Sequence, residues 1–300
     1  MHVFVTGASG WIGSAVTAEL LAAGHQVLGL ARSERSAAAL RDRGAEPWAG
    51  DLDDLDSLRR GADSADAVVH LGFKHDFSDL ATAWRTERTA ATALLDTLAG
   101  SDRPFLIASG FLGMPDGRPA TERDVSSAAG PDAPRGGSER LALDYVERGV
   151  RAVPLRFSAS VHGTRDHGFV ATLVGVARER GAAGYIGDGA NRWPAVHVAD
   201  AARVVRLALD KAPAGTIVHA VAEEGVPTRA IADAIASRLG VPSVSVDPGD
   251  ADEHFGWIAR FFAADQPASS TLTRDLLGWQ PTGPTLLEDL AAGAYDVAPS

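Results

Sequence analysis

A glycine-rich stretch near the start of the chain constrains its fold more than any other feature. It reads Gly7-Ala8-Ser9-Gly10-Trp11-Ile12-Gly13, between the apolar run 3–6 and a helical pattern over 12–23. Its three glycines allow a tight turn, close approach of the backbone to a pyrophosphate, and close helix–strand packing. The N–H groups at the start of a helix favour phosphate. The stretch therefore predicts a dinucleotide-binding βαβ unit with the pyrophosphate at these seven residues.

Short apolar runs alternate with helical patterns through the first half of the chain, which predicts an α/β fold with a parallel sheet. We expect strands at 3–6, 26–30, 47–49, 67–71, 105–108, 152–157 and 216–220. We expect helices at 12–23, 36–43, 54–60, 78–98, 138–148, 169–180, 199–209 and 228–239. The predicted fold is a Rossmann-type doubly wound sheet with a small C-terminal substrate-binding lobe. The predicted nucleotide domain covers 1–160 and about 195–222, and the lobe covers 161–194 and 223–300.

The end of the second predicted strand bears on the choice between NAD and NADP. An acidic residue there would accept hydrogen bonds from the ribose 2′-hydroxyl of NAD. This chain instead has Ala31, Arg32 and Ser33, and an arginine can pair with a 2′-phosphate. We therefore expect NADP in preference to NAD; the alternative is that Arg32 is a solvated loop charge.

Composition narrows the classes of partner. The formal net charge is −11, whereas a nucleic-acid binder needs a basic face, so we expect no nucleic-acid partner. The chain has no cysteine and no histidine spacing typical of zinc, so we expect no metal. It begins without a signal-peptide pattern, and no apolar run approaches the roughly 20 residues of a membrane helix. We expect a cytoplasmic protein with a small-molecule substrate and no membrane partner.

Further motifs are spread along the chain. They are Gly50-Asp51-Leu52, Val68-Val69-His70-Leu71, Leu155-Arg156, Val161-His162-Gly163, Val196-His197-Val198-Ala199-Asp200 and Leu277-Gly278-Trp279-Gln280-Pro281. Together with the glycine stretch, they resemble the extended short-chain dehydrogenase/reductase superfamily, often labelled NAD-dependent epimerase/dehydratase. The resemblance covers nearly the whole chain.

The resemblance implies a path for the cofactor. Asp51 and Leu52 would lie along the adenine. The riboses would lie over Leu71, Gly72 and Phe73, and the nicotinamide near Phe157 and Ser158. Residues 70–77 also resemble the stretch that borders the substrate in the dihydroflavonol reductase-like branch. Superfamily members often dimerise through helices resembling 78–98 and 138–148, so the resemblance implies a homodimer.

The catalytic pair of the superfamily is missing. Members normally carry Tyr-x-x-x-Lys at the start of the fifth helix, where the Tyr exchanges a proton with the substrate oxygen and the Lys lowers its pKa. The only lysines here, at positions 74 and 211, lie far from that helix. Aligning 135–139 with the motif puts Arg135 at the Tyr position and Glu139 at the Lys position. The helical Asn of the extended group aligns near Glu87.

Carbonyl reduction needs a group that stabilises or protonates the developing alkoxide. Arg135 can stabilise this charge but does not deprotonate; the alternative is a surface arginine. Histidine titrates near neutral pH, so His75, His162 and His167 are candidate acids, each with a structural alternative. The superfamily's Ser or Thr after the fifth strand falls near Ser109. We name His75, Ser109 and Arg135 as candidate catalytic residues.

The stretch 187–194 predicts a substrate-pocket loop, in which Trp193 stacks on an apolar or ring-shaped substrate. The alternative is a turn that covers the core. We expect His197 to cap the following helix. The candidate substrate-binding residues are His75, Phe111, His162, His167, Tyr185, Asn191, Arg192 and Trp193.

Three functions follow from these features. The first is an NADP(H)-dependent oxidoreductase that acts on a small-molecule carbonyl or alcohol with non-standard acid–base residues. The second is an epimerase or dehydratase on the same scaffold. The third is a catalytically silent NADP-binding sensor similar to the NmrA-like regulators, which the lost Tyr–Lys pair favours.

Overall fold

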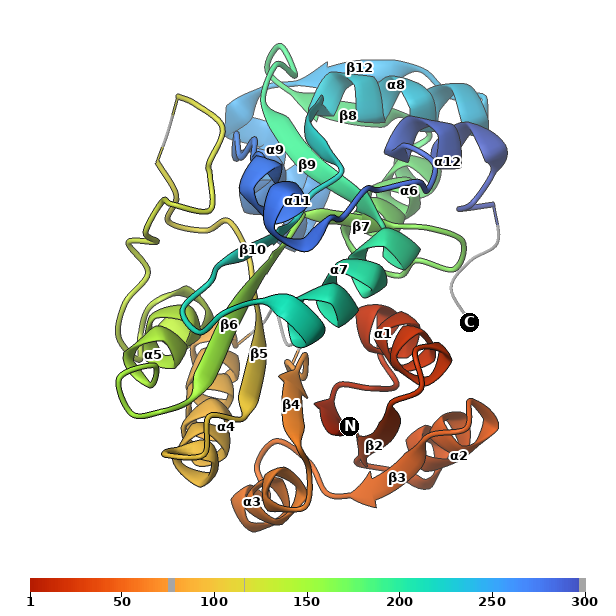
Figure 1. The fold of residues 1–300 in the computed structure, drawn as a ribbon. Helices are drawn as coiled ribbons and strands as arrows, with labels where there is room; N and C mark the ends of the chain where they lie inside the picture. Colours follow the sequence, from red (N-terminus) through yellow and green to blue (C-terminus); the bar gives the residue numbers. More distant parts are fainter. Residues whose placement is uncertain (75–78, 116, 297–300) are drawn as a thin grey trace.

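The central sheet contains seven parallel strands that follow the predicted runs. In the computed structural model, which describes residues 1–74, 79–115 and 117–296, they are β1 (His2–Thr6), β2 (Gln26–Ala31), β3 (Glu46–Ala49), β4 (Ala67–His70), β5 (Pro104–Ser109), β6 (Arg151–Phe157) and β10 (Val218–Ala220). Their order across the sheet is β10-β6-β5-β4-β1-β2-β3 (Figure 1). The order reverses between β1 and β4, and open α/β sheets bind ligands beyond the carboxyl ends of the strands at such a point.

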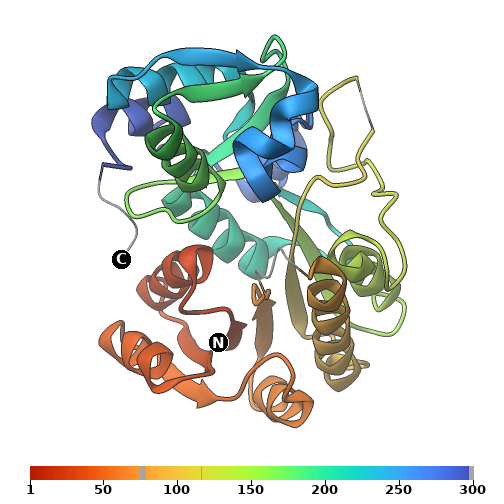
Figure 2. The same cartoon turned by 180° about the vertical axis from the view of Figure 1, so that it is seen from behind.

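Helices cover both faces of this sheet because side chains alternate along its strands. One face packs on α1 (Trp11–Ala22), α2 (Glu34–Asp42) and α7 (Val198–Lys211). The other packs on α3 (Leu55–Asp63), α4 (Leu80–Leu98) and α5 (Ser138–Asp144). Val3 and Val5 lie in the first core, and Phe4 between them lies in the second. Figure 2, from behind, brings α4 to the front.

A second group of elements lies above the sheet in Figure 1. Its strands are β7 (Ser160–His162), β9 (Arg192–His197) and β11 (Glu223–Pro227) in one sheet, and β8 (Ala183–Ile186) and β12 (Ser243–Val246) in another. Its helices are α6 (Phe169–Arg180), α8 (Thr228–Leu239), α9 (Ala251–Phe255), α10 (Ala259–Phe262) and α12 (Leu286–Ala292). These elements share a separate apolar core that includes Trp193 and Phe262. We call this group the second lobe.

The predicted fold class is confirmed: a parallel seven-stranded Rossmann-like sheet lies between helices. Two details differ. The predicted helix 138–148 ends at Asp144, and a 3-10 turn, η1 (Pro134–Gly137), precedes it. The loop predicted at 187–194 includes the first residues of β9, and Gly187 and Gly189, both with positive φ, turn the chain between β8 and β9.

The domain limits given above stay a prediction. The C-terminal segment, which they assign to the lobe, packs partly on the main sheet. The helix α11 (Thr271–Leu277) is followed by Trp279, which is buried in the core of the main sheet. The indole of Trp279 donates to the carbonyl oxygen of Asp200 at 3.2 Å, and the Asp200 carboxylate accepts from the backbone N–H of Gly283 at 2.7 Å. Two of the sequence motifs therefore hold each other in place.

Within the described parts of the chain, no helix is both long enough and apolar enough to span a bilayer.

Candidate functional site

The glycine stretch forms a turn that leaves no room for side chains. Gly7 has φ +69°, and a Cβ there would lie 2.8 Å from the backbone nitrogen of Gly72. A Cβ on Gly13 would lie 2.0 Å from the carbonyl oxygen of Gly7. The first helix begins at Trp11 without a side-chain cap, which leaves its first amides without side-chain partners, and the residues at this helix start line the cavity described next.

One cavity of about 860 Å³ runs along this turn and the carboxyl ends of the strands. It brings together residues from the turn, the ends of β4, β5 and β6, and the start of α6. The predicted cofactor residues that line it are Gly7, Ser9, Gly10, Trp11, Ile12, Gly13, Arg32, Asp51, Leu52, Leu71, Gly72, Phe73, Ser109, Phe157 and Ser158. Ala8 does not line the cavity, because its side chain is fully buried. The cofactor assignment itself stays a proposal.

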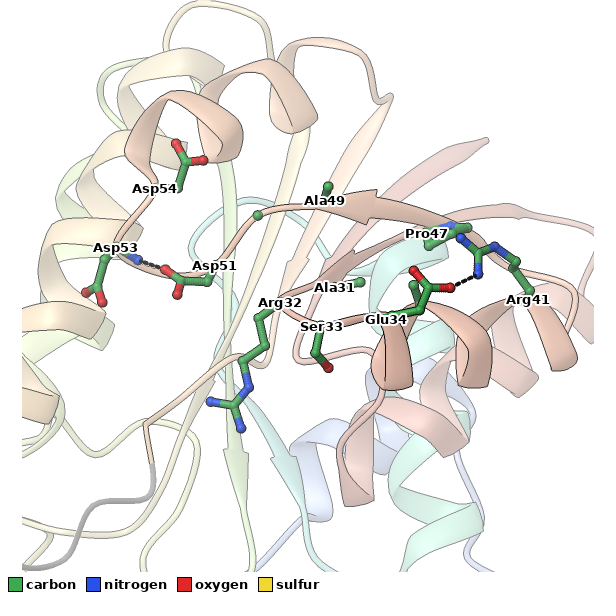
Figure 3. Close-up of a pocket in the computed structure, with 12 residues that line it drawn as sticks. Ala31, Arg32, Ser33, Glu34, Arg41, Pro47, Ala49, Asp51, Asp53 and Asp54 are labelled. Atoms are coloured by element: carbon green, nitrogen blue, oxygen red, sulfur yellow. Dashed lines mark hydrogen bonds and ion pairs between the residues drawn. The ribbon is translucent and has the colours of Figure 1, made fainter.

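A neighbouring open cleft of about 740 Å³ lies where β2 and β3 end (Figure 3). Ala31, Arg32, Ser33 and Asp51 line it. The Arg32 side chain extends away from the ion pair between Glu34 and Arg41. The Ser33 hydroxyl caps α2 by accepting from the backbone N–H of Ser36 at 3.2 Å. Arg32 thus lies beside a helix N-terminus, which favours anions.

Arg135 lines the main cavity and is held from three sides. It has φ +52° within η1, and its side chain is 25% exposed. One terminal nitrogen donates to Glu87 at 2.7 Å and to the carbonyl oxygen of Ala108 at 3.0 Å. The guanidinium carbon lies 4.6 Å from the ring centre of Phe73. These contacts fix a cation at the cavity wall, at the position that the sequence analysis aligns with the superfamily's tyrosine.

Two buried titratable groups lie close to this guanidinium. Burial raises the pKa of Glu87 to about 7, although Arg135 acts in the opposite direction. Burial, with the charge of Arg135 adding to it, lowers the pKa of His70 to about 3. The neutral His70 ring shares a hydrogen bond of 2.8 Å with the hydroxyl of Thr6, which also accepts from the N–H of Gly72 at 3.0 Å. Sequence reasoning gave Glu87 no catalytic or binding role.

The raised pKa of Glu87 predicts a pH effect on stability. The folded protein holds this proton more tightly than the unfolded chain, so Glu87 lowers the free energy of unfolding as pH rises from about 4.5 to about 7. Glu87→Gln cannot ionise. We therefore expect the free energy of unfolding of Glu87→Gln, minus that of the wild type, to increase by about 3 kcal/mol as pH rises over this range. Urea unfolding at about pH 5 and about pH 8 measures the change. The exposed Glu147→Gln is the control; a Glu87→Gln difference that stays constant with pH would contradict the prediction.

Ser109 and Glu139 take part in a buried network. The Ser109 hydroxyl donates to Glu139 at 2.8 Å. Glu139 also accepts from Arg156 at 2.5 and 3.0 Å, and Arg156 is fully buried. Burial lowers the pKa of His219 to about 4, so its neutral ring accepts from Arg156 at 3.2 Å and donates to the carbonyl of Ser269 at 2.6 Å. Glu139, which the sequence analysis aligns with the superfamily's lysine, is therefore a carboxylate held in a buried ion pair.

The predicted stacking of a substrate on Trp193 is wrong, and its neighbours Asn191 and Arg192 do not line the cavity. Trp193 lies in β9, has no exposed surface, and donates to the carbonyl oxygen of Phe261 at 3.0 Å. The Asn191 amide donates to the carbonyl oxygen of Phe262 at 2.6 Å, and Arg192 pairs with Asp265 at 2.8 Å. These side chains hold the second lobe together because the segment is a strand and not an open loop.

Three other predicted substrate residues also lie outside the cavity. His162 is fully buried and hydrogen-bonded to Asp289 at 2.6 Å. Phe111 packs edge-on against His219, with ring centres 4.8 Å apart, in a small apolar cluster. The Arg229 guanidinium lies over the ring of Tyr185, with its carbon 5.2 Å from the ring centre. Burial or contacts with neighbouring side chains keep each of these three residues out of the cavity lining.

His167 does line the cavity, edge-on to Trp11 with ring centres 6.0 Å apart. His75 lies outside the described residues. His197 caps α7 as expected, by accepting from the N–H of Ala199 at 3.3 Å. Sequence reasoning missed Ser160, Phe169 and Trp257, which also line the cavity; no local pattern marks them, because packing of the second lobe brings them there.

Comparisons with known proteins identify relatives over most or all of the chain. A family model described as "NAD dependent epimerase/dehydratase family" matches residues 3–221. A Schizosaccharomyces pombe protein named "Uncharacterized protein C2A9.02" is 46% identical over 98% of this chain and all of its own length. A ketoreductase of Stigmatella aurantiaca that acts on 4-hydroxy-2-methyl-3-oxo-4-farnesyl-3,4-dihydroquinoline-1-oxide is 28% identical over 72% of this chain and 67% of its own.

Among solved structures, the dTDP-glucose 4,6-dehydratase DesIV from Streptomyces venezuelae, with NAD and TYD bound, has a TM-score of 0.78. It is 22% identical, and the match covers 98% of this chain and 96% of DesIV. At this identity the likeness supports the fold.

Proposed function

Because this chain belongs to the NAD dependent epimerase/dehydratase family, we propose that it reduces the carbonyl group of a small molecule with NADPH. The observation that carries the proposal is that Arg135 lines the same cavity as the glycine turn. A fixed cation therefore lies beside the proposed cofactor site, where the superfamily's tyrosine would be.

The residues present fit a dinucleotide. The backbone contacts of Gly7 and Gly13 exclude a Cβ at either position, so the backbone itself forms the wall. The uncapped start of α1 supplies amide donors suited to a pyrophosphate. Ala31 and Arg32 support NADP, because β2 ends in Ala31 and not in an acidic residue, and Arg32 follows it beside the N-terminus of α2.

This cofactor preference predicts a selective loss. Arg32→Ala should raise the Kd for NADP about 10- to 100-fold, because a charge-assisted hydrogen bond contributes roughly 1.5–3 kcal/mol. The Kd for NAD should change less than about threefold, since NAD lacks the 2′-phosphate. Calorimetric titration with both cofactors measures the two constants. Arg43→Ala, on the exposed end of α2, is the matched control. An unchanged NADP Kd in Arg32→Ala would show that the 2′-phosphate lies elsewhere.

In the proposed reaction Arg135 holds negative charge on the substrate oxygen. The bound cofactor would supply a hydride to the carbonyl carbon. Arg135 keeps its own proton, so it stabilises the oxygen as the carbon–oxygen double bond breaks. The proton that completes the alcohol then comes from water, because the Ser109 hydroxyl already donates to Glu139.

One observation favours the alternative of a silent NADP-binding sensor. Ser109 and Arg135 both make internal contacts, with Glu139 and Glu87 respectively. Epimerase or dehydratase chemistry has less support, because it needs a group that takes up and returns a proton, and arginine does neither.

The test is consumption of NADPH by the purified protein with a panel of aldehydes, ketones and imines. Turnover that produces the alcohol or amine supports the proposed reductase. Tight NADP binding without turnover across the panel would replace it with the sensor.

A further inference from the structure

The wall of the cavity opposite the main sheet is aromatic. Asp166 and His167 line it from the loop before α6, Phe169 and Thr172 from the first turn of α6, and Trp257 from the 3-10 turn η3 (Gly256–Ile258). We call these five residues the second-lobe wall. Phe169 and Trp257 meet edge to face with ring centres 5.7 Å apart.

Packing from behind fixes both rings. The ring of Phe169 lies 5.1 Å from that of Phe261 and 5.7 Å from that of the buried Trp193. Gly256, with φ +63°, ends α9 in a conformation that L side chains rarely adopt, and Ile258 is fully buried. Trp257 between them is 39% exposed. The fold thus presents a large indole at the cavity instead of burying it.

The positively charged side chains that line the cavity come from its main-sheet side. Arg32, Lys74 and Arg135 line it from the main-sheet side, and no lysine or arginine belongs to the second-lobe wall, among the residues the structure describes. The Asp166 carboxylate is buried, accepting from the Tyr295 hydroxyl at 2.8 Å and the N–H of Gly168 at 2.6 Å. Arg260 stacks on Phe261 and does not line the cavity. A diphosphate against this wall would meet a carboxyl group and no cation.

We propose that the second-lobe wall binds the ring of an uncharged aromatic carbonyl compound, and not a nucleotide sugar. This proposal rests on the proposed reductase function and names its substrate class. Aromatic rings pack edge-to-face and offset on one another, and binding sites combine such surfaces with few polar groups. The ring would lie against Trp257 and Phe169, with the carbonyl group directed toward Arg135 across the cavity.

The first experiment compares acetophenone with butanone as substrates of Trp257→Ala. We expect kcat/KM for acetophenone to fall about 10-fold or more, from the loss of an aromatic contact and of apolar burial, and kcat/KM for butanone to fall less than about threefold. Trp257→Phe should keep most of the acetophenone activity. Leu276→Ala, which removes another exposed apolar side chain outside the cavity, is the control. An equal loss for both ketones would overturn the proposal.

The second experiment does not depend on turnover. Calorimetric titration of the NADP-loaded protein with acetophenone and with UDP-glucose measures binding alone. Binding of acetophenone that weakens in Trp257→Ala, with the Kd for NADP unchanged, supports the substrate class even if no ketone is reduced; in that case only the proposed reductase function fails. Binding of UDP-glucose and not acetophenone, binding of neither, or a weakened Kd for NADP in Trp257→Ala overturns the proposal.

Discussion

Replacing Arg135 with alanine should lower kcat/KM for carbonyl reduction about 100- to 1000-fold, the effect seen when one preorganised donor to a developing oxyanion is removed. The Kd for NADP should change less than about threefold, because in the proposed binding mode the glycine turn and Arg32 hold the parts of the cofactor away from the reacting carbonyl group. Arg135→Lys should recover part of the rate, because it keeps a positive charge but loses the planar guanidinium that contacts Glu87, Ala108 and Phe73. Steady-state NADPH oxidation and calorimetric titration measure the two quantities.

The control for Arg135 is Arg140→Ala, which removes an exposed arginine that pairs with Asp144. It should leave kcat/KM within about twofold of the wild type. Loss of Arg135 also leaves Glu87 without its ion-pair partner, so the double variant Arg135→Ala with Glu87→Gln separates a catalytic loss from misfolding. If Arg135→Ala turns over ketones at the wild-type rate, the guanidinium does not stabilise the substrate oxygen.

The main sheet could be predicted from the sequence because its signals are local. A buried parallel strand such as β4 is a short apolar run, and the glycine turn has a conformational requirement that only glycine meets. The second lobe could not be predicted equally well. Its β9 begins with Arg192 and Trp193, a polar and an aromatic side chain that suggested a binding loop.

The candidate site likewise contains residues that could be predicted from the sequence and residues that could not. The residues of the glycine turn were predicted from the turn motif itself, and those at the ends of the later strands from the resemblance to the superfamily. Trp257 and Phe169 were missed because they are far apart in sequence and meet only through packing of the second lobe. In sequence, Glu87 only aligns near the helical Asn of the extended group, and its contact with Arg135 depends on the folded structure.

The buried pair of Glu139 and Arg156 suggests why this chain does not carry the superfamily's lysine. Glu139→Lys would place a second cation against a fully buried guanidinium, whose other hydrogen-bond partners among the described residues are the neutral His219 and backbone carbonyls. Breaking a buried ion pair from one side costs about 3–5 kcal/mol, and like charge adds to this. We therefore expect Glu139→Lys to lower the free energy of unfolding by at least about 3 kcal/mol, measured by urea unfolding.

Two further variants test whether that loss arises from the ion pair. Asp144→Asn removes the exposed ion pair with Arg140 on the same helix and should cost no more than about 1 kcal/mol. Glu139→Met combined with Arg156→Met should be more stable than Glu139→Lys, because apolar residues can replace a buried pair without leaving a charge unpaired. A Glu139→Lys protein within about 1 kcal/mol of the wild type would contradict the argument. Restoring Tyr-x-x-x-Lys by Arg135→Tyr with Glu139→Lys should then fail first at folding, because position 139 in this chain belongs to the network that anchors β6.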